Sequence, residues 1–597
     1  MRNQTLNGAL CLLAVFALSP SLEAAPIQEG TFTARGTFAT SATKRTATRL
    51  TLQFRRLTAD TFEVTRTEAK TGVWLGRGKV LGQSLVVQFR RRRGIAASLR
   101  SSASASRSAT TRAVFSFSSQ EVVYARYYPG TRSQKLIGFE KGRRARGGEA
   151  KLGVRRSKLF QIVIQAANSA PLPGTTADQR ALVTVNNWAG VEVLIEPERI
   201  YKKYAELIEG AEHDVALQTF AWDKDSQPVD EVFRGLQRLQ ERRRQAGATR
   251  AVKVRILIDT MTSGMNMNTK TQDIFLELRI MRSEYKLDPQ FVDLRVGAYD
   301  HKLLGSMHSK SLVVDGRVAV LTGANMNKND NWDTGEHDAG FVLGGAVALS
   351  LLADFDDAWL KSRVWKAGDF GYGNRWMRAL PMAEATRIPS RVVHRIAPPR
   401  PSERQIPMMV VGKQARDGLF PTRKTGHPLN RTYLALLDNA KREIHIQTPN
   451  LNEREIKAAL VAAVRRGVRV KMVLSKGYEK FAESMPYQGG TNQENVEDLY
   501  ERLARAGVDS PKSRLQIRWY RHGSASRGPV EGNSAKANHV KYLAVDGQIT
   551  LVTSLNNDTQ SWRSSREIGV VIDDVATTRR WGRQLFTPDF RNGVQVD

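Results

Sequence analysis

The spacing of apolar and polar residues changes once along the chain, near the turn PLPG at 171–174. Before this turn, from about residue 30 to 160, short runs such as RLTLQFRRL and SLVVQFRRR alternate apolar and polar positions and are separated by Gly, Ser and Thr. Such alternation predicts antiparallel strands, so we expect an all-β domain, a small barrel or sandwich, over residues 27–170. After the turn, strand-like and helix-like segments alternate, which predicts an α/β fold.

Four segments of the α/β region occur twice, in the same order. AEHDVALQTFAW matches AKREIHIQTPNL, VKVRILID matches VRVKMVLS, LRVGAYDH matches LQIRWYRH, and MHSKSLVVDG matches NHVKYLAVDG. The offset is 229 residues for the first pair and 231 for the histidines of the last pair. A nearly constant offset indicates a tandem duplication. We therefore expect one lobe over 180–365, a second over 421–597, and a connector over 366–420 that contains a Pro-rich stretch.

The size and charge of the chain limit its architecture and its partners. With 597 residues it is too long for one hydrophobic core, and 41% hydrophobic residues is typical of globular proteins. The formal net charge is +32, from 91 Lys and Arg against 59 Asp and Glu. This excess favours a polyanionic partner such as nucleic acid, anionic lipid or a cell-surface polymer, but it does not choose among them.

The N-terminus is typical of an export signal. An early Arg precedes an apolar run over about 8–18, and small residues follow at Ala24 and Ala25. The run is too short to span a bilayer, so we predict a signal peptide over 1–25 and an exported bacterial protein, periplasmic or secreted, with a retained anchor as the alternative. The only cysteine, Cys11, lies in this run. Cleavage would therefore leave a chain without disulfides, thiol catalysis or cysteine-based zinc sites.

The last repeated segment reads in both copies as a buried strand that ends in an Asp-Gly turn. Residues two apart on a strand share a face, so His308 and Lys310 point the same way, as do His539 and Lys541. Burying such residues is costly unless their face lines a cleft. A structural His beside an exposed Lys would explain either copy alone, but not the same pair twice in a duplicated fold. We therefore predict that both pairs line an active site.

A second strand and a polar turn follow each copy. Asn325 and Asn556 each stand 17 residues after their histidine, and Ser554 lies in the second turn. These groups suit a phosphate, because the ammonium neutralises its charge while the amide, hydroxyl and nearby N–H groups donate hydrogen bonds. Two lobes about a pseudo-two-fold axis would surround one phosphorus with two His, two Lys and two Asn, within one monomer. We expect Asp315 and Asp546 to orient the turn and loop rather than to touch substrate.

A downstream acid is expected to complete each lobe. In the second lobe it is Glu567, within SREIGVVID. In the first lobe Asp338 matches it when Gly340 and Gly569 are aligned, whereas equal spacing from the histidine selects Glu336. Either carboxylate would hold an imidazole N–H and fix its tautomer.

The pattern H-x-K-x4-D followed by a G-S-x-N-like turn, present twice, resembles the signature of the phospholipase D superfamily over about 195–580. The resemblance implies two tandem phospholipase D-like α-β-α sandwich lobes that form a pseudo-two-fold dimer, here preceded by the all-β N-terminal domain. Two positions depart from the pattern. The glycine that opens the turn is Thr322 in one lobe and Thr553 in the other, and the serine, kept as Ser554, is Gly323 in the first lobe.

The resemblance also implies a mechanism. One histidine attacks phosphorus to give a covalent phosphohistidine, and the other protonates the leaving alcohol and then deprotonates water or an acceptor alcohol. It makes His308 the nucleophile and His539 the acid and base, and no metal or other cofactor is expected. The motif residues in the implied catalytic set are His308, Lys310, Asp315, His539, Lys541 and Asp546.

The expected function joins this chemistry to the predicted export. We expect an exported phospholipase D-type phosphodiesterase or phosphatidyltransferase that cleaves or transfers phosphatidyl groups of phospholipids, held at an anionic membrane surface by its positive charge. The alternatives are an exported nuclease acting on nucleic-acid phosphodiesters, a cardiolipin synthase-like transferase, and a surface-binding protein whose β-domain does the main work.

Overall fold

The structure, a computed structural model, separates the chain into two compact units. One comprises Met1–Gly153 and Thr386–Arg391, and the other comprises Val154–Ala385 and Val392–Asp597. The residues described are 156–175, 182–185, 187–260, 271–299, 305–366, 377–378, 405–416, 418, 420–523 and 528–596, together with the strands between 30 and 144. The predicted signal segment 1–25 and much of the predicted connector lie outside these residues.

The first unit contains eight strands. They are β1 (Gly30–Ala39), β2 (Arg45–Thr58), β3 (Thr61–Glu68), β4 (Gly72–Leu81), β5 (Ser84–Arg91), β6 (Thr111–Phe117), β7 (Val122–Pro129) and β8 (Gly138–Arg144). Each strand pairs antiparallel with the next, and β1 also pairs with β8, which closes the sheet into a barrel. Closure leaves the sheet without a free edge strand.

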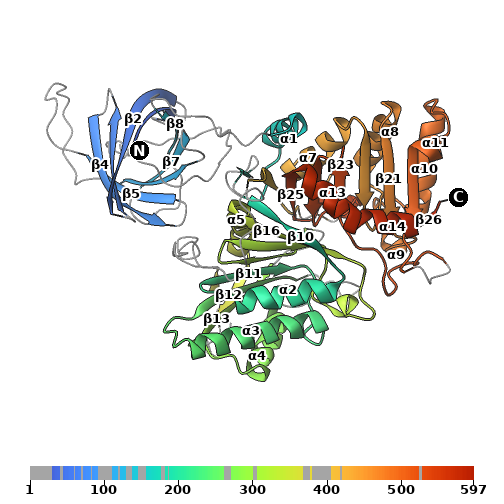
Figure 1. Cartoon of the computed structure of the whole chain (residues 1–597), viewed down its shortest axis with the longest axis horizontal. Coiled ribbons are helices and arrows are strands. Elements are labelled where there is room, and N and C mark those ends of the chain that lie inside the picture. Colours follow the sequence, from blue (N-terminus) through green and yellow to red (C-terminus); the bar gives the residue numbers. More distant parts are fainter. Residues whose placement is uncertain are drawn as a thin grey trace, which may run out of the picture. The chain divides into compact units, whose positions relative to one another are not determined.

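The second unit contains both α/β lobes, drawn in green to yellow and in orange to red in Figure 1. The first lobe consists of β10 (Asn187–Ile195), α2 (Pro197–Glu209), β11 (Asp214–Thr219), α3 (Gln227–Gln245), β12 (Val252–Asp259), α4 (Thr271–Glu284), β13 (Val292–Tyr299), β14 (Ser311–Val314), β15 (Val318–Thr322), η1 (Lys328–Asp330), β16 (Ala339–Gly345), α5 (Ala346–Leu360), β17 (Arg363–Lys366) and β18 (Met377–Arg378).

The second lobe begins with two elements from before the first lobe. It consists of α1 (Lys158–Asn168), β9 (Leu182–Thr184), β19 (Met408–Lys413), α7 (Pro428–Asp438), β20 (Glu443–Gln447), α8 (Arg454–Arg465), β21 (Arg469–Leu474), α9 (Lys480–Glu483), α10 (Asn492–Arg505), α11 (Pro511–Arg514), β22 (Leu515–Trp519), β23 (Tyr542–Val545), β24 (Ile549–Thr553), α12 (Thr559–Arg563), β25 (Glu567–Asp573), α13 (Val575–Gln584), α14 (Phe586–Asn592) and β26 (Val594–Gln595).

The two sheets repeat one topology. The first has the order β10-β16-β15-β14-β11-β12-β13-β17-β18, and the second has the order β26-β22-β21-β20-β23-β24-β25-β19-β9. The strands β11, β12 and β13 are parallel, as are their counterparts β20, β21 and β22. The motif strands β14 and β23 run antiparallel to the neighbours that flank them. This agreement confirms the two-lobed α/β fold expected from the repeated segments.

Each lobe has its own apolar core, because amphipathic helices cover the sheet. In the first lobe Ile200 of α2 and Val232 of α3 pack with Ile256 of β12, and Figure 1 shows α2, α3 and α4 along one side of that sheet. In the second lobe Leu436 of α7 and Leu460 of α8 are part of the core. That core also includes residues of α1, which lies inside the range predicted for the β-rich domain. Among the described residues, no helix is both long and apolar enough to cross a membrane.

Candidate active site

Two short backbone pairings join the lobes. The residues just before the motif histidines, Met307 and Asn538, form parallel bridges with Arg566 and His337 of the opposite lobe. The N–H of each motif histidine then donates to the carbonyl of the bridged residue, at 2.9 Å for Arg566 and 2.8 Å for His337. The bridged residues are the ones that precede Glu567 and Asp338 in the sequence. Each histidine therefore lies beside the predicted acid of the other lobe.

The side chains complete this exchange. Nδ1 of His308 lies 3.0 Å from Oε1 of Glu567. Nδ1 of His539 lies 2.8 Å from Oδ2 of Asp338 and 3.3 Å from Oε2 of Glu336. The sequence predicted one acid for each lobe without naming its histidine, and the structure places each acid on the histidine of the other lobe, because the pairings cross the lobe interface. A neutral imidazole that donates its Nδ1–H to a carboxylate carries its lone pair on Nε2, which is then free to react.

The two acids are held differently. The hydroxyl of Ser554 donates to Oε2 of Glu567 at 2.5 Å, and Ser561 donates to the other oxygen. Ser554, predicted to bind phosphate, is thus placed as a support for the carboxylate. Gly323 occupies the matching position in the first lobe, where a Cβ would lie 2.7 Å from both carboxylate oxygens of Asp338. The departure from the motif therefore has a steric reason, since the carboxylate takes the space of the missing side chain.

Burial decides the charge of these groups. It lowers the pKa of His308 to about 4, although Glu567 favours the protonated ring. It also lowers the pKa of His539 well below its usual value, although Glu336 acts in the opposite direction. Burial disfavours ionisation of Glu567 as well, but His308 and Lys310 outweigh it and lower the pKa of that carboxyl. At neutral pH the site therefore holds two neutral imidazoles and an ionised carboxylate.

The two motif lysines are buried at the same place. Nζ of Lys310 donates to the carbonyl of His308 at 3.0 Å, and Nζ of Lys541 donates to that of His539 at 2.6 Å. Burial and then the Lys541 ammonium lower the pKa of Lys310 to about 7. Two buried ammonium groups that repel each other favour an anion between them. Within the described ranges, no three His, Cys, Asp or Glu side chains come together in a way that would hold a metal ion.

The predicted asparagines lie at equivalent, buried positions. The N–H of Asn325 donates to Oδ2 of Asp330 at 3.1 Å, and the N–H of Asn556 donates to Oγ of Ser561 at 2.9 Å. Each turn is thus closed by a residue five positions later. The side-chain oxygen of Asn556 is buried without a hydrogen-bond partner among the described residues. Their predicted role in binding phosphate stays a prediction.

The motif aspartates lie at the other end of their strands. Asp315 follows β14 with φ 52°, and Asp546 follows β23 with φ 55°. Their carboxylates accept backbone N–H groups of Glu212, His213 and Asp214 in the first lobe, and of Lys441, Arg442 and Glu443 in the second. They therefore fix the turn after the motif strand to the loop before its neighbour, and they are placed to orient rather than to react.

One charged residue at the lobe interface escaped the sequence analysis. His337 lies 2.6 Å from Oε1 of Glu196 through Nδ1 and 2.8 Å from Oδ2 of Asp589 through Nε2, and it stacks on Tyr520. Burial disfavours its charged form, but Asp589 and Glu196 outweigh burial and raise the pKa of His337 to about 10. The His337 imidazolium therefore bridges Glu196 of the first lobe and Asp589 of the second. In the sequence it lies between Glu336 and Asp338, the two acids that contact His539. The only sequence signal is the triplet EHD, in which the histidine separates those acids.

We predict that His337→Gln flattens the dependence of stability on pH. Because the folded pKa is raised, the stabilisation is complete below about pH 6.5, the value of an unfolded histidine, and is lost as pH rises through about 10. The thermal midpoint of the parent chain should therefore fall more steeply than that of the variant between about pH 7 and 10. His445→Gln is the control, because burial lowers the pKa of His445 and leaves it neutral across this window. Parallel curves for parent and His337→Gln would contradict the bridge.

A second buried residue ties the lobes beside Glu567. The guanidinium of Arg566 donates to Oδ1 and to the backbone carbonyl of Asp354, both at 2.8 Å, and to Asp357 at 2.7 Å. Both aspartates are on α5 of the first lobe. Arg566 also takes part in the backbone pairing that positions His308. Arg566 thus forms a buried ion pair across the lobe interface and also helps to position His308 in the candidate active site.

Comparison with known proteins points to one family. The family model described as "Cardiolipin synthase, PLD-like domain" matches residues 433–586. The chain is 20% identical over 414 residues to the probable cardiolipin synthase YwiE of Bacillus subtilis (strain 168), a match that covers 68% of this chain and 67% of the relative. A phosphatidylserine synthase of Haemophilus influenzae Rd KW20 aligns with a TM-score of 0.47 and 17% identity, over 74% of this chain and 92% of that one. Nuc of Salmonella typhimurium, a phospholipase D family member, aligns with a TM-score of 0.22 and 17% identity, over 32% and 98%.

Proposed function

The chain belongs to the phospholipase D superfamily, and on that premise we propose that it is a phospholipid-modifying enzyme that transfers or hydrolyses phosphatidyl groups through a phosphohistidine. The observation that carries the proposal is the pair of neutral imidazoles, each oriented by a carboxylate of the other lobe, beside two buried ammonium groups. The site thus combines an uncharged nucleophile, a second imidazole that can take up and release a proton, and ammonium groups that counter the charge of a phosphate.

The phosphodiester anion would lie between the two lobes. Lys310 and Lys541 would neutralise its charge, and the site excludes water because both lysines are almost fully buried. Binding of the anion restores the charged form of Lys310, whose pKa is otherwise about 7. The lysines therefore stabilise the transition state more than the bound substrate, because the negative charge on the oxygens bound to phosphorus is greatest there.

The reaction divides into two displacements at phosphorus. Nε2 of His308 attacks, a P–N bond forms, and the P–O bond to the leaving alcohol breaks as His539, which takes up a proton on Nε2 once the phosphate is bound, donates that proton to the leaving oxygen. Water or an acceptor alcohol then attacks the phosphohistidine, giving its proton to His539, and His308 is released as the neutral imidazole. Glu567 accepts the Nδ1–H of His308 throughout, and thereby stabilises the positive charge that develops on the ring.

The surroundings of the two histidines support this division of roles. His539 faces two carboxylates, Asp338 and Glu336, whereas His308 faces one. Lys541 and Lys310 act against protonation of His539. A bound phosphate that pairs with these lysines removes that effect, and the two carboxylates then favour the imidazolium that a general acid requires.

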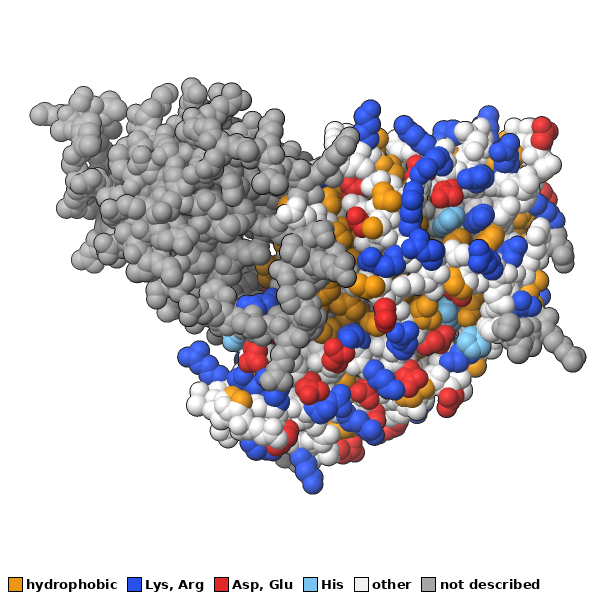
Figure 2. All heavy atoms as spheres, in the orientation of Figure 1, with side chains coloured by type: hydrophobic (Ala, Val, Ile, Leu, Met, Phe, Trp, Pro, Cys, Tyr) orange, Lys and Arg blue, Asp and Glu red, His pale blue; other side chains and the backbone are white. Residues whose placement is uncertain are grey.

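Transfer to an alcohol is the reaction we place first, because the matching family model and the curated relative are both named for cardiolipin synthases. An anionic membrane is the proposed location of the substrate. The net charge of +32 suits such a surface, and Figure 2 shows Lys and Arg side chains spread over both lobes on the face it draws. The signal-like N-terminus supports export of the chain to the periplasm or the medium.

The test uses the full chain and phosphatidylglycerol vesicles in the presence of a chelator. We expect release of glycerol and formation of a lipid with two phosphatidyl groups, both detected by mass spectrometry and both absent with His308→Ala. Phosphatidic acid as the only product would assign hydrolysis in place of transfer. Nicking of a supercoiled plasmid by the parent chain but not by His308→Ala, without lipid turnover, would replace this proposal by a nuclease.

A further inference from the structure

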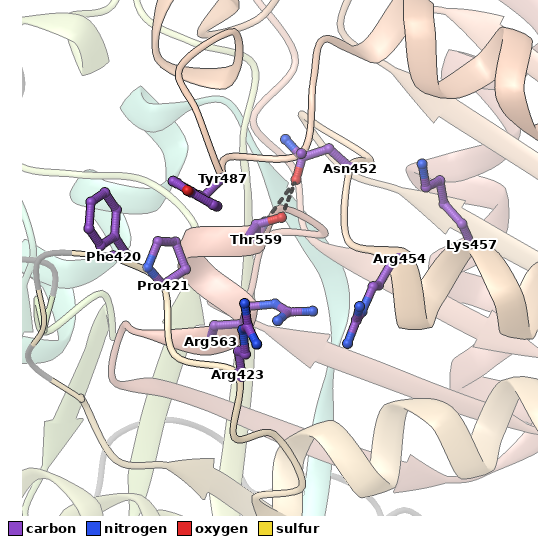
Figure 3. Close-up of a pocket in the computed structure, with 10 residues that line it drawn as sticks. Phe420, Pro421, Arg423, Asn452, Arg454, Lys457, Tyr487, Thr559 and Arg563 are labelled. Atoms are coloured by element: carbon purple, nitrogen blue, oxygen red, sulfur yellow. Dashed lines mark hydrogen bonds between the residues drawn. The ribbon is translucent and has the colours of Figure 1, made fainter.

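The second lobe has a cavity of about 810 Å³ that none of the motif residues lines. Its wall comes from four segments: the residues before α7, the start of α8, the loop after α9, and α12 (Figure 3). Thr559 of this wall follows the predicted phosphate-binding Asn556 by three residues. The cavity therefore adjoins the turn that serves the active site, but it is a separate feature.

The charge of the cavity wall is of one sign. Four cationic side chains line it, and no carboxylate does. Arg563 pairs with Glu453 through two bonds of 2.8 Å, and Lys457 pairs with Asp498 at 2.9 Å. Arg423 and Arg454 are the other two; both are solvent-exposed and make no hydrogen bond or ion pair within the described part of the chain. The wall thus has two guanidinium groups free to pair with an anion.

Arg454 does not stabilise the helix in which it lies. It is the first residue of α8, directly after the N-cap Glu453. A cation at a helix N-terminus faces the positive end of the helix dipole, an arrangement that disfavours the helix. An anion in the cavity would reverse this effect, because it would face both the guanidinium and the dipole.

The rim of the cavity is apolar and exposed. Phe420 is 57% exposed and Tyr487 is 69% exposed, and their rings contact each other with centroids 5.0 Å apart. Phe481, 75% exposed, and Met485, 50% exposed, belong to the same segment as Tyr487. Among the described residues, the aromatic members of the set of exposed large hydrophobics are Phe420 and Tyr487, which line the cavity, and Phe481, six residues before Tyr487. Such a patch costs solvation free energy unless something apolar covers it.

The rim is anchored to the wall behind it. The side-chain oxygen of Asn452 accepts the N–H of Thr559 at 2.8 Å and also its hydroxyl, bonds drawn as dashed lines in Figure 3. The amide nitrogen of Asn452 donates to Glu483 at 3.2 Å and to the carbonyl of Gly490 at 3.3 Å. These bonds fix both ends of the segment that carries Met485 and Tyr487.

We propose that this cavity binds the phosphate of an anionic phospholipid that is not the one being cleaved, and that the apolar rim enters the membrane interface. Unpaired arginines beside exposed aromatic and Met side chains combine the two interactions that hold proteins on anionic bilayers. A lipid meets both features, since its phosphate reaches the arginines while its glycerol and acyl carbons cover the rim. Docking requires no turnover, so the inference stands apart from the proposed chemistry.

The test measures sedimentation of the full chain with vesicles of phosphatidylcholine containing about 30% phosphatidylglycerol. All proteins carry His308→Ala, so that no lipid is consumed. Each well-placed basic residue contributes ~1 kcal/mol, about fivefold in affinity. We expect Arg423→Ala with Arg454→Ala to weaken binding by about 30-fold, and Phe481→Ser with Tyr487→Ser to weaken it at least as much.

The matched control is Arg465→Ala with Arg514→Ala. It removes the same charge from the same lobe, at the far end of α8 and on α11, and we expect less than a threefold change. Equal binding by the control and the cavity variant would overturn the proposal, as would a cavity variant that loses an oligonucleotide or inorganic phosphate but keeps the vesicles. Turnover of a short-chain, soluble phospholipid by the chain with His308 intact reports on the proposed chemistry separately. Absence of that turnover, with the vesicle pattern as expected, would reject the chemistry and retain the docking site.

Discussion

His308→Ala abolishes both lipid turnover and the phosphoenzyme, whereas His539→Ala abolishes turnover but still forms a phosphoenzyme: this is the result expected from the two histidine environments. Without His308 there is no Nε2 to form the P–N bond. Without His539 the leaving alcohol lacks its proton, and loss of a general acid costs about 10²–10⁴-fold in rate. A substrate with a p-nitrophenolate leaving group needs no proton, so His539→Ala should release one equivalent of nitrophenol in a burst and then stop.

Rapid mixing followed by mass measurement of the intact chain under alkaline conditions detects the adduct directly. The control is Ser554→Ala, which removes one hydrogen bond to Glu567 but leaves both histidines. It should lower the rate, yet it should retain burst and turnover. An adduct that survives His308→Ala, or that maps to His539 in the parent chain, would reverse the two roles.

Sequence comparison between the lobes selected the candidate reactive groups because chemistry restricts what can replace them. Burying a His and a Lys two residues apart on a strand costs free energy, so their repetition at a fixed offset indicates a functional role. The duplication itself predicted the common topology of the two sheets, which the structure confirms. The choice between Glu336 and Asp338 had no unique answer in the sequence, and the structure shows why, since both carboxylates reach His539.

The partner of each acid could not be predicted in the same way. Spacing along the chain measures distance within a lobe, whereas the bonds of Glu567 and Asp338 cross between lobes. Ser554 was assigned to phosphate for a different reason, because the motif does not show that its hydroxyl donates to Glu567 on the neighbouring strand of the same lobe. The counterpart of His337 in the second lobe is Arg566, a different type of residue, so comparison of the two copies selected neither of them. The sequence therefore missed contacts that cross between the lobes and residues whose type differs between the two copies.

The buried pair between Arg566 and Asp354 gives the largest expected effect on stability. Arg566→Met leaves Asp354 fully buried, with Gln218 as its one remaining polar side-chain partner within the described part of the chain. Removing one member of a buried ion pair costs about 3–5 kcal/mol, whereas replacing the whole pair with apolar residues is often neutral. We expect chemical denaturation, followed by tryptophan fluorescence, to show this loss for Arg566→Met, and most of it to be recovered when Asp354→Leu is added.

The same substitution should also lower activity, because Arg566 shares the backbone pairing that places His308 and directly precedes Glu567. Arg255→Met is the matched control, since Arg255 is equally buried and pairs with Asp214 and Asp356 inside the first lobe alone. Both variants should lose similar stability, but at a temperature where both remain folded only Arg566→Met should lose kcat. If Arg255→Met lost kcat to the same extent, the activity loss would follow from general destabilisation. If neither lost it, Arg566 would hold the lobes together without positioning the site.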